Sequence, residues 1–146
     1  MANNDVLMNP NELVRFLQKP AADFTRDDIV RFIEARGISM VNFRYPAEDG
    51  RLKTLNFVPH SREHLVSILT AGERVDGSSL FSFIESGSSD LYVIPRYRTA
   101  FMNPFAETPA LEILCSFYNN EGRPLESAPD QILRKAYSRF TSTTGL

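Results

Sequence analysis

Val75-Asp76-Gly77-Ser78-Ser79 is the stretch around which the rest of the chain is organised. It lies between a helical pattern and a series of short strands, with apolar residues close on both sides. Glycine has backbone freedom that other residues lack, and Asp and Ser side chains bond to nearby backbone, so this composition favours a tight turn. The alternative interpretation is that the loop presents Asp76 as a carboxylate to a ligand or partner.

Upstream of this stretch the sequence predicts helices and a hairpin. Helix-start residues, helical spacing of apolar residues and stop signals predict helices between Asn9 and Pro20, Thr25 and Gly37, and Ser61 and Gly72. Apolar and polar residues alternate over 40–45, and a second extended segment covers 52–58. The short turn-rich connection between these segments predicts an antiparallel hairpin.

Downstream, the sequence predicts three further strands and a last helix. A polar loop covers 85–89, and the strands are expected at 91–94, 99–102 and 110–118, of which 110–118 alternates most cleanly. Pro129 opens an amphipathic helix. Strands and helices that mix without a regular β-α-β order predict an α+β domain with one mixed sheet.

Composition limits the classes of function. The chain has 146 residues, 42% hydrophobic and 23% charged, which fits one soluble globular domain. A net charge of −2 without a basic stripe argues against nucleic acid as a partner. No apolar run approaches the ~20 residues that span a membrane, and Met1 to Asp5 lack the features of a signal peptide. The lone Cys115, expected to be a buried small hydrophobe, fits a reducing cytoplasm.

No catalytic cluster is evident from the residues alone. His60 and His64 are four apart, but no Cys or carboxylate completes a metal set, so solvent-facing histidines are expected and no metal site in this chain. No phosphate-binding loop is present. Ser78 or Ser79 as a nucleophile has no histidine nearby in sequence.

Two other charged groups have simple interpretations. Arg96 and Arg98 flank Tyr97 and could bind an anion, although a solvated turn is the simpler expectation. Glu112 lies on the polar side of the 110–118 alternation and is expected at the surface.

An ordered series of segments resembles glutamine synthetase in its N-terminal domain. The Asp76-Gly77-Ser78-Ser79 loop resembles the family's Asp-Gly-Ser-Ser loop. The other segments that resemble the family, in chain order, are 41–45 with 49–50, Glu85 with Ser89-Asp90, 91–95, 99–101, 103–105, 122–124 and 132–136. The resemblance covers about residues 36–145.

This resemblance implies a β-grasp fold and three regions: an N-terminal helical extension over 1–35, the β-grasp domain over 36–126, and a helix over 127–146 that leads towards a catalytic domain. In the family, ATP and Mg or Mn act on glutamate and ammonia through a γ-glutamyl phosphate. By the same resemblance, the N-terminal domain supplies one wall of the neighbouring subunit's active site in a homo-oligomeric ring. Asp76 would then bind ammonium and take up its proton, with Gly77, Ser78 and Ser79 supporting the loop.

The sequence also departs from the family pattern. Asn42, Arg96 and Asn103 each stand where the family has Asp, and Glu126 begins an unusual lead-in to the last helix. The chain ends about where the family's catalytic domain begins, so we expect an excised fragment that is inactive alone, carries no cofactor itself, and contacts catalytic domains of its own and neighbouring subunits. The alternatives are a ligase that joins glutamate to another amine, and a free-standing β-grasp binding module without catalysis.

Overall fold

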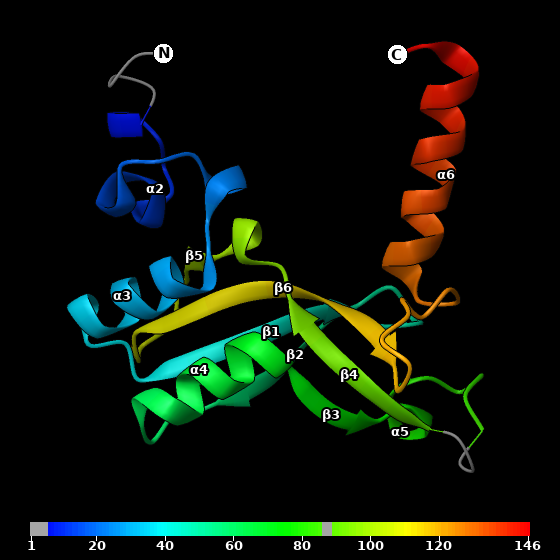
Figure 1. Cartoon of the computed structure of the whole chain (residues 1–146), viewed down its shortest axis with the longest axis horizontal. Coiled ribbons are helices and arrows are strands. Elements are labelled where there is room, and N and C mark those ends of the chain that lie inside the picture. Colours follow the sequence, from blue (N-terminus) through cyan, green and yellow to red (C-terminus); the bar gives the residue numbers. More distant parts are fainter. Residues whose placement is uncertain (1–5, 86–88) are drawn as a thin grey trace.

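The computed structural model describes residues 6–85 and 89–146, and in these residues the chain forms a mixed sheet with helices at both ends (Figure 1). Residues 1–5, part of the expected N-terminal helical extension, and residues 86–88, part of the expected 85–89 loop, lie outside the described residues. The strands are β1 Met40–Pro46, β2 Leu52–Phe57, β3 Glu73–Asp76, β4 Asp90–Pro95, β5 Phe101–Met102 and β6 Ala110–Asn119. The helices include α2 Glu12–Leu17, α3 Arg26–Arg36, α4 Arg62–Ala71, α5 Gly77–Leu80 and α6 Pro129–Thr144, with 3-10 turns at Ala21–Asp23 and Tyr97–Thr99.

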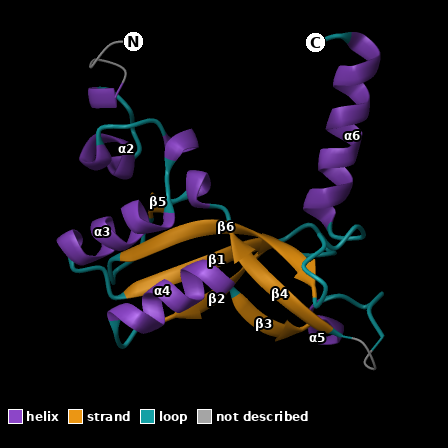
Figure 2. Cartoon of the chain, in the orientation of Figure 1, coloured by secondary structure: helices purple, strands orange, loops and turns teal. Residues whose placement is uncertain are grey.

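The strand order is β2-β1-β6-β4-β3, and β5 pairs with β6 beside this path. β1 and β2 form the expected antiparallel hairpin, whereas β1 and β6 run parallel with Phe43 opposite Ile113. β6 therefore lies at the centre of the sheet, and its long alternating segment is confirmed as a strand. The α+β class with one mixed sheet is confirmed (Figure 2).

The helix starts predicted at Thr25 and Ser61 are confirmed by their capping bonds, whereas the first helix begins at Glu12, two residues later than a cap at Asn9 would place it. Thr25 Oγ1 accepts a hydrogen bond from Asp28 N, and the Asp28 carboxylate accepts one from Thr25 N, which completes a capping box. Asn11 and Ser61 cap α2 and α4 through their side-chain oxygens. These bonds satisfy backbone N–H groups that have no partner within the helix.

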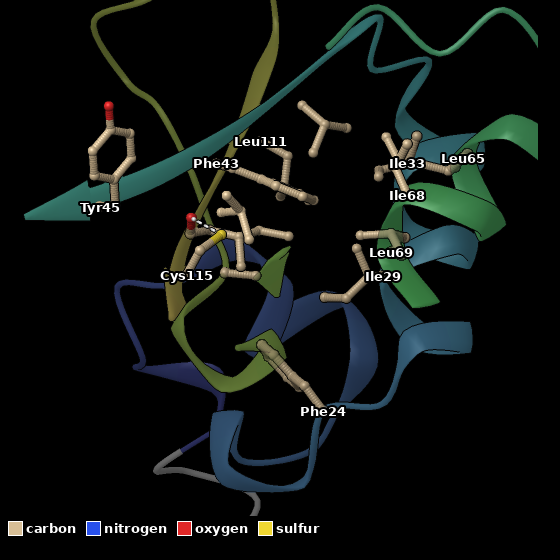
Figure 3. Packing of buried hydrophobic residues seen from close by; sticks show 14 of the residues in the cluster. Phe24, Ile29, Ile33, Phe43, Tyr45, Leu65, Ile68, Leu69, Leu111 and Cys115 are labelled. Atoms are coloured by element: carbon tan, nitrogen blue, oxygen red, sulfur yellow. Dashed lines mark hydrogen bonds between the residues drawn. The ribbon is translucent and has the colours of Figure 1, made fainter. Parts of the chain in front are cut away.

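One hydrophobic core joins the helices to one face of the sheet. α3 and α4 lie side by side across that face, and Ile29, Ile33 and Leu69 point towards Phe43 and Leu111 (Figure 3). The core also takes in Leu13, Val14 and Leu17 of α2, all buried. Burial of each large apolar side chain contributes about 1.5–3 kcal/mol, so the N-terminal helices are integral to the packing of the sheet.

Cys115 is fully buried in this core, as expected for a small hydrophobe. Burial raises the pKa of its thiol well above the ordinary value. The Cys115 thiol donates a hydrogen bond to the Ile113 backbone oxygen at 3.5 Å, and Figure 3 draws a dashed line from the Cys115 sulfur.

The edge strand β3 was not predicted from the sequence. It follows α4 immediately, because Gly72 turns the chain with a φ of +69°. A Cβ atom at this position would lie 2.2 Å from the backbone oxygen of Val93 on β4, so only glycine fits. β3 then pairs antiparallel with β4, which places Asp76 opposite Asp90.

The predicted 99–102 strand is shorter than expected, since Tyr97–Thr99 forms a 3-10 turn and only Phe101–Met102 pairs with β6. The hydroxyl of Thr99 explains the difference. It donates to the Arg96 carbonyl at 2.7 Å and accepts from Leu114 N at 2.9 Å, so a side chain replaces a strand partner.

The expectation that Glu112 lies at the surface is wrong, because its side chain is fully buried. The segment after β5 covers this face of β6, and Asn103 Nδ2 donates to Glu112 Oε1 at 2.8 Å. Asn42 Nδ2 donates to the same oxygen at 2.9 Å, and Arg44 pairs with the other oxygen. Burial raises the pKa of Glu112, but the bonds from Arg44, Asn42 and Asn103 outweigh this effect and lower the pKa below its ordinary value.

The amphipathic α6 stands away from the sheet (Figure 1). Its apolar residues Ile132, Leu133, Tyr137 and Phe140 are all more than half exposed, so no described residue covers this face. None of the described helices is long and apolar enough to cross a membrane.

Candidate functional site

Asp76 lies at the junction between strand β3 and the short helix α5. Its Oδ1 accepts hydrogen bonds from the backbone N of Ser78 at 3.0 Å and from the Ser78 hydroxyl at 2.7 Å. Asp76 therefore caps α5, and the expected tight turn is a strand-to-helix junction.

The Asp76 carboxylate is exposed and favours its charged form. Hydrogen bonds from the hydroxyls of Ser78 and Ser89 and from the Ser78 backbone hold the pKa of Asp76 below its ordinary value. An exposed carboxylate that is ionised throughout the physiological pH range is suited to attract a cation.

The two serines of the loop have different roles. Ser78 binds the carboxylate of Asp76, whereas the Ser79 hydroxyl donates to the Asp76 backbone oxygen at 2.7 Å. Ser78 therefore stabilises the ionised carboxylate of Asp76, whereas Ser79 holds the backbone of Asp76 in place.

Gly77 fixes the loop against the neighbouring strand. Its N–H donates to the Ser89 carbonyl at 2.6 Å, and Gly77 itself is buried. An added Cβ would lie 2.7 Å from Leu91 Cδ1 and 2.9 Å from Ser89 O. The absence of a side chain is what allows this close approach.

The segment after Gly77 is anchored at two further points. Phe81 is fully buried, and its ring meets the Phe117 ring edge-on with centroids 5.0 Å apart. Glu48, in the β1–β2 turn, accepts hydrogen bonds from the N and Oγ of Ser82, both at 2.9 Å. The loop is thus held by the core on one side and the hairpin on the other.

Sequence reasoning identified Asp76 and its neighbours but not the contact between Glu48 and Ser82. These residues are 34 positions apart, and no local pattern connects them. His60 and His64 stack with ring centroids 4.2 Å apart, and the described residues contain no group of three His, Cys, Asp or Glu side chains that could hold a metal.

Comparison with known proteins gives consistent results for sequence and structure. The chain is 23% identical over 125 residues to a glutamine synthetase of Methanococcus maripaludis, covering 82% of this chain and 28% of that protein. It is 27% identical over 123 residues to a glutamine synthetase of Staphylococcus epidermidis, covering 83% of this chain and 27% of that protein. The chain therefore spans about a quarter of the length of the curated relatives it matches.

Solved structures share the fold. The glutamine synthetase of Plasmodium falciparum superposes with a TM-score of 0.68 at 17% identity, over 82% of this chain and 23% of that one. The GmaS protein without ligand superposes with a TM-score of 0.67 at 14% identity, over 79% of this chain and 26% of that one.

The family model described as "Glutamine synthetase, beta-Grasp domain" matches residues 37–120, which include the whole Asp76 loop and all six strands. Because this match covers more than half of the chain, the chain belongs to the glutamine synthetase β-grasp domain family.

Proposed function

We propose that this chain is the β-grasp part of a glutamate–ammonia ligase, and that its Asp76 loop forms one wall of an ammonium site shared with a neighbouring subunit. The observation that carries the proposal is the Asp76 carboxylate itself. It is exposed, ionised and held at the β3–α5 junction, within the segment that the family model matches.

The chemistry follows from the charge of Asp76. An ionised carboxylate attracts ammonium, and its low pKa makes it a weak base while water surrounds it. When a neighbouring subunit covers the loop, desolvation raises the pKa of the carboxylate and favours proton transfer from the bound ammonium. Asp76 would therefore bind the cation while its loop is exposed to water, and would take up the proton once a neighbouring subunit covers the loop.

The remaining chemistry is assigned to the rest of the ligase. ATP and Mg or Mn would bind in a catalytic domain, and the ligase would assemble as a homo-oligomeric ring. Purified alone, the 146-residue chain is expected to form no glutamine, because stabilisation of phosphoryl transfer needs metal ions.

The test is Asp76→Asn in a complete ligase that carries this chain as its N-terminal part. We expect activity at low ammonium to fall by roughly 10²-fold or more, with ATP binding retained, since general acid–base groups contribute about 10²–10⁴-fold. Asp90→Asn is the matched control, because Asp90 lies opposite Asp76 on β4 and is also exposed. An equal loss in both variants would indicate a general charge effect and would remove Asp76 from the ammonium site.

The second candidate is a ligase that joins glutamate to another amine, which the structural likeness to GmaS keeps open. Assaying the complete ligase with ammonium and with methylamine separates these two candidates. A reading frame that stops after Leu146 would instead favour a free-standing binding module, and the catalytic proposal would fail.

A further inference from the structure

A groove of about 670 Å³ runs between α6 and the end of the sheet. None of the residues that line it belongs to the Asp76 loop. Its charged walls are Arg96 and Arg98, which precede β5, and Arg134 on α6. Its apolar walls are Leu52, Leu133 and Tyr137. Residues from four separate parts of the sequence thus meet around one concave surface.

Among residues 6–85 and 89–146, the arginines of this groove have no carboxylate partner, unlike most other basic residues. Ten Lys and Arg residues form ion pairs within 4 Å in the described structure, and Arg96, Arg98 and Arg134 are not among them. The one acidic residue in the groove, Asp130, instead accepts hydrogen bonds from Ser116 Oγ at 2.7 Å and from Gln131 Nε2 at 3.2 Å. The groove therefore concentrates positive charge in a chain whose net charge is −2.

A second, independent observation concerns the hydrogen bonding of Arg96. Its Nε atom is buried and has no hydrogen-bond partner among the described residues. A buried donor without a partner destabilises the structure, and the cost is larger when the group is charged. An anion beside the terminal nitrogens of Arg96 would offset this cost through its charge, because the buried Nε itself has no exposed surface from which to donate.

We propose that this groove binds a small organic anion, whose phosphate or carboxylate group lies between Arg96, Arg98 and Arg134 and whose apolar part rests on Leu133 and Tyr137. The planar guanidinium group forms paired hydrogen bonds with either kind of anion. The apolar walls select a ligand with a carbon skeleton over an inorganic ion, because they gain only from burying apolar surface. This site is independent of the proposed ammonium chemistry at Asp76.

Titration of the 146-residue chain with phenyl phosphate, phenylbutyrate and inorganic phosphate, followed by NMR, tests the proposal. Saturable shifts of the Arg96 and Arg134 side-chain N–H signals are expected with at least one organic probe. Inorganic phosphate should bind at least about fivefold more weakly than phenyl phosphate, since it lacks the apolar part. The two organic probes distinguish a phosphate site from a carboxylate site, and either supports the proposal.

Variants make the test specific. Arg96→Gln and Arg134→Gln should each weaken binding of the preferred probe by about tenfold or more. Arg134 is exposed on α6, so its replacement leaves the fold intact even if Arg96→Gln perturbs the groove. Arg123→Gln is the control, because it removes the same charge from an exposed turn outside the groove.

Three results would overturn the proposal. One is no saturable binding of either organic probe. Another is equal weakening by Arg134→Gln and Arg123→Gln, which would indicate attraction to overall charge. The third is binding of a polyglutamate peptide in the groove without binding of the small probes, which would assign the groove to an acidic protein segment.

Discussion

Glu112 on β6 and Arg44 on β1 form an ion pair across the two central strands, although 68 positions separate them in the sequence. The carboxylate of Glu112 is fully buried, whereas the Arg44 side chain is 27% exposed. Asn42 and Asn103 complete the bonding of Glu112, and Asn56 Nδ2 on β2 donates to Asn42 Oδ1 at 2.8 Å. A connected polar network therefore ties the hairpin, the central strand and the loop after β5 together.

Glu112→Gln should lower the free energy of unfolding by about 2–3 kcal/mol. The substitution keeps the size of the side chain but leaves Arg44 without its charged partner, and breaking a buried pair is strongly destabilising. Urea unfolding followed by circular dichroism measures the change. Glu126→Gln is the matched control, since it breaks an exposed pair with Lys135 that solvent screens, and its effect on stability should be much smaller. Equal losses would contradict a structural role for the network.

Gly72→Ala should lower the free energy of unfolding by about 3 kcal/mol or more. The new Cβ would meet the Val93 backbone oxygen, and the residue would also keep a positive φ. Gly122→Ala separates these two costs, because Gly122 has a φ of +73° but nothing within 4 Å of the added Cβ. It should lose only about 1 kcal/mol. If urea unfolding gives a similar loss of unfolding free energy for both variants, β3 and β4 must move apart enough to accommodate the added Cβ at position 72.

Stability should fall in acid as Asp28 takes up a proton. Burial raises the pKa of Asp28, but hydrogen bonds from Lys19 and Thr25 outweigh it and lower the pKa to about 2. Because the folded-state pKa lies below the unfolded value of about 3.8, the stabilisation is complete above pH 4 and is lost between about pH 4 and pH 2. The loss is about 2 kcal/mol.

The Asp28 effect is measured as the difference in free energy of unfolding between pH 5 and pH 2.5. Asp28→Asn removes the titrating group, so its pH dependence over this interval should be smaller than that of the original chain by most of this amount. Identical slopes in the two proteins would assign the acid sensitivity to other carboxylates.

Ser78→Ala should raise the pKa of the Asp76 carboxyl, because the Ser78 hydroxyl is the largest cause of its low value. Ser79→Ala should leave that pKa unchanged, since the Ser79 hydroxyl binds the Asp76 backbone oxygen. The pKa of Asp76 in both variants is measured by following the chemical shift of its carboxyl carbon with pH by NMR. A rise in the Ser79 variant equal to that in the Ser78 variant would show that loop geometry, and not the hydroxyl bond, sets the pKa.

Local patterns predicted the elements that depend on local interactions. The caps at Thr25 and Ser61, the β1–β2 hairpin and the central strand over 110–118 were all readable from residue spacing, and the structure confirms them. The end of the third helix at Gly72 was also predicted from the sequence, but Asp76 itself ends strand β3 and does not lie in a loop.

Long-range contacts could not be predicted from local sequence patterns. Alternation placed Glu112 on the polar face of its strand, but it carries no information about the segment around Asn103 that covers this face. β3 was missed because it is only four residues long and draws its partner, β4, from beyond the Asp76 loop. The groove arginines Arg96 and Arg98 were noticed, but Arg134 joins them only through the placement of α6.

The central position of β6 has a consequence for synthesis of the chain. Of the six described strands β6 is made last, yet β1, β4 and β5 all pair with it. The β1–β2 hairpin must therefore wait for some sixty further residues, several seconds at roughly 5–20 residues per second, before its second edge is covered. During that interval the nascent chain exposes an unpaired strand edge, which can pair wrongly with an edge strand of another chain.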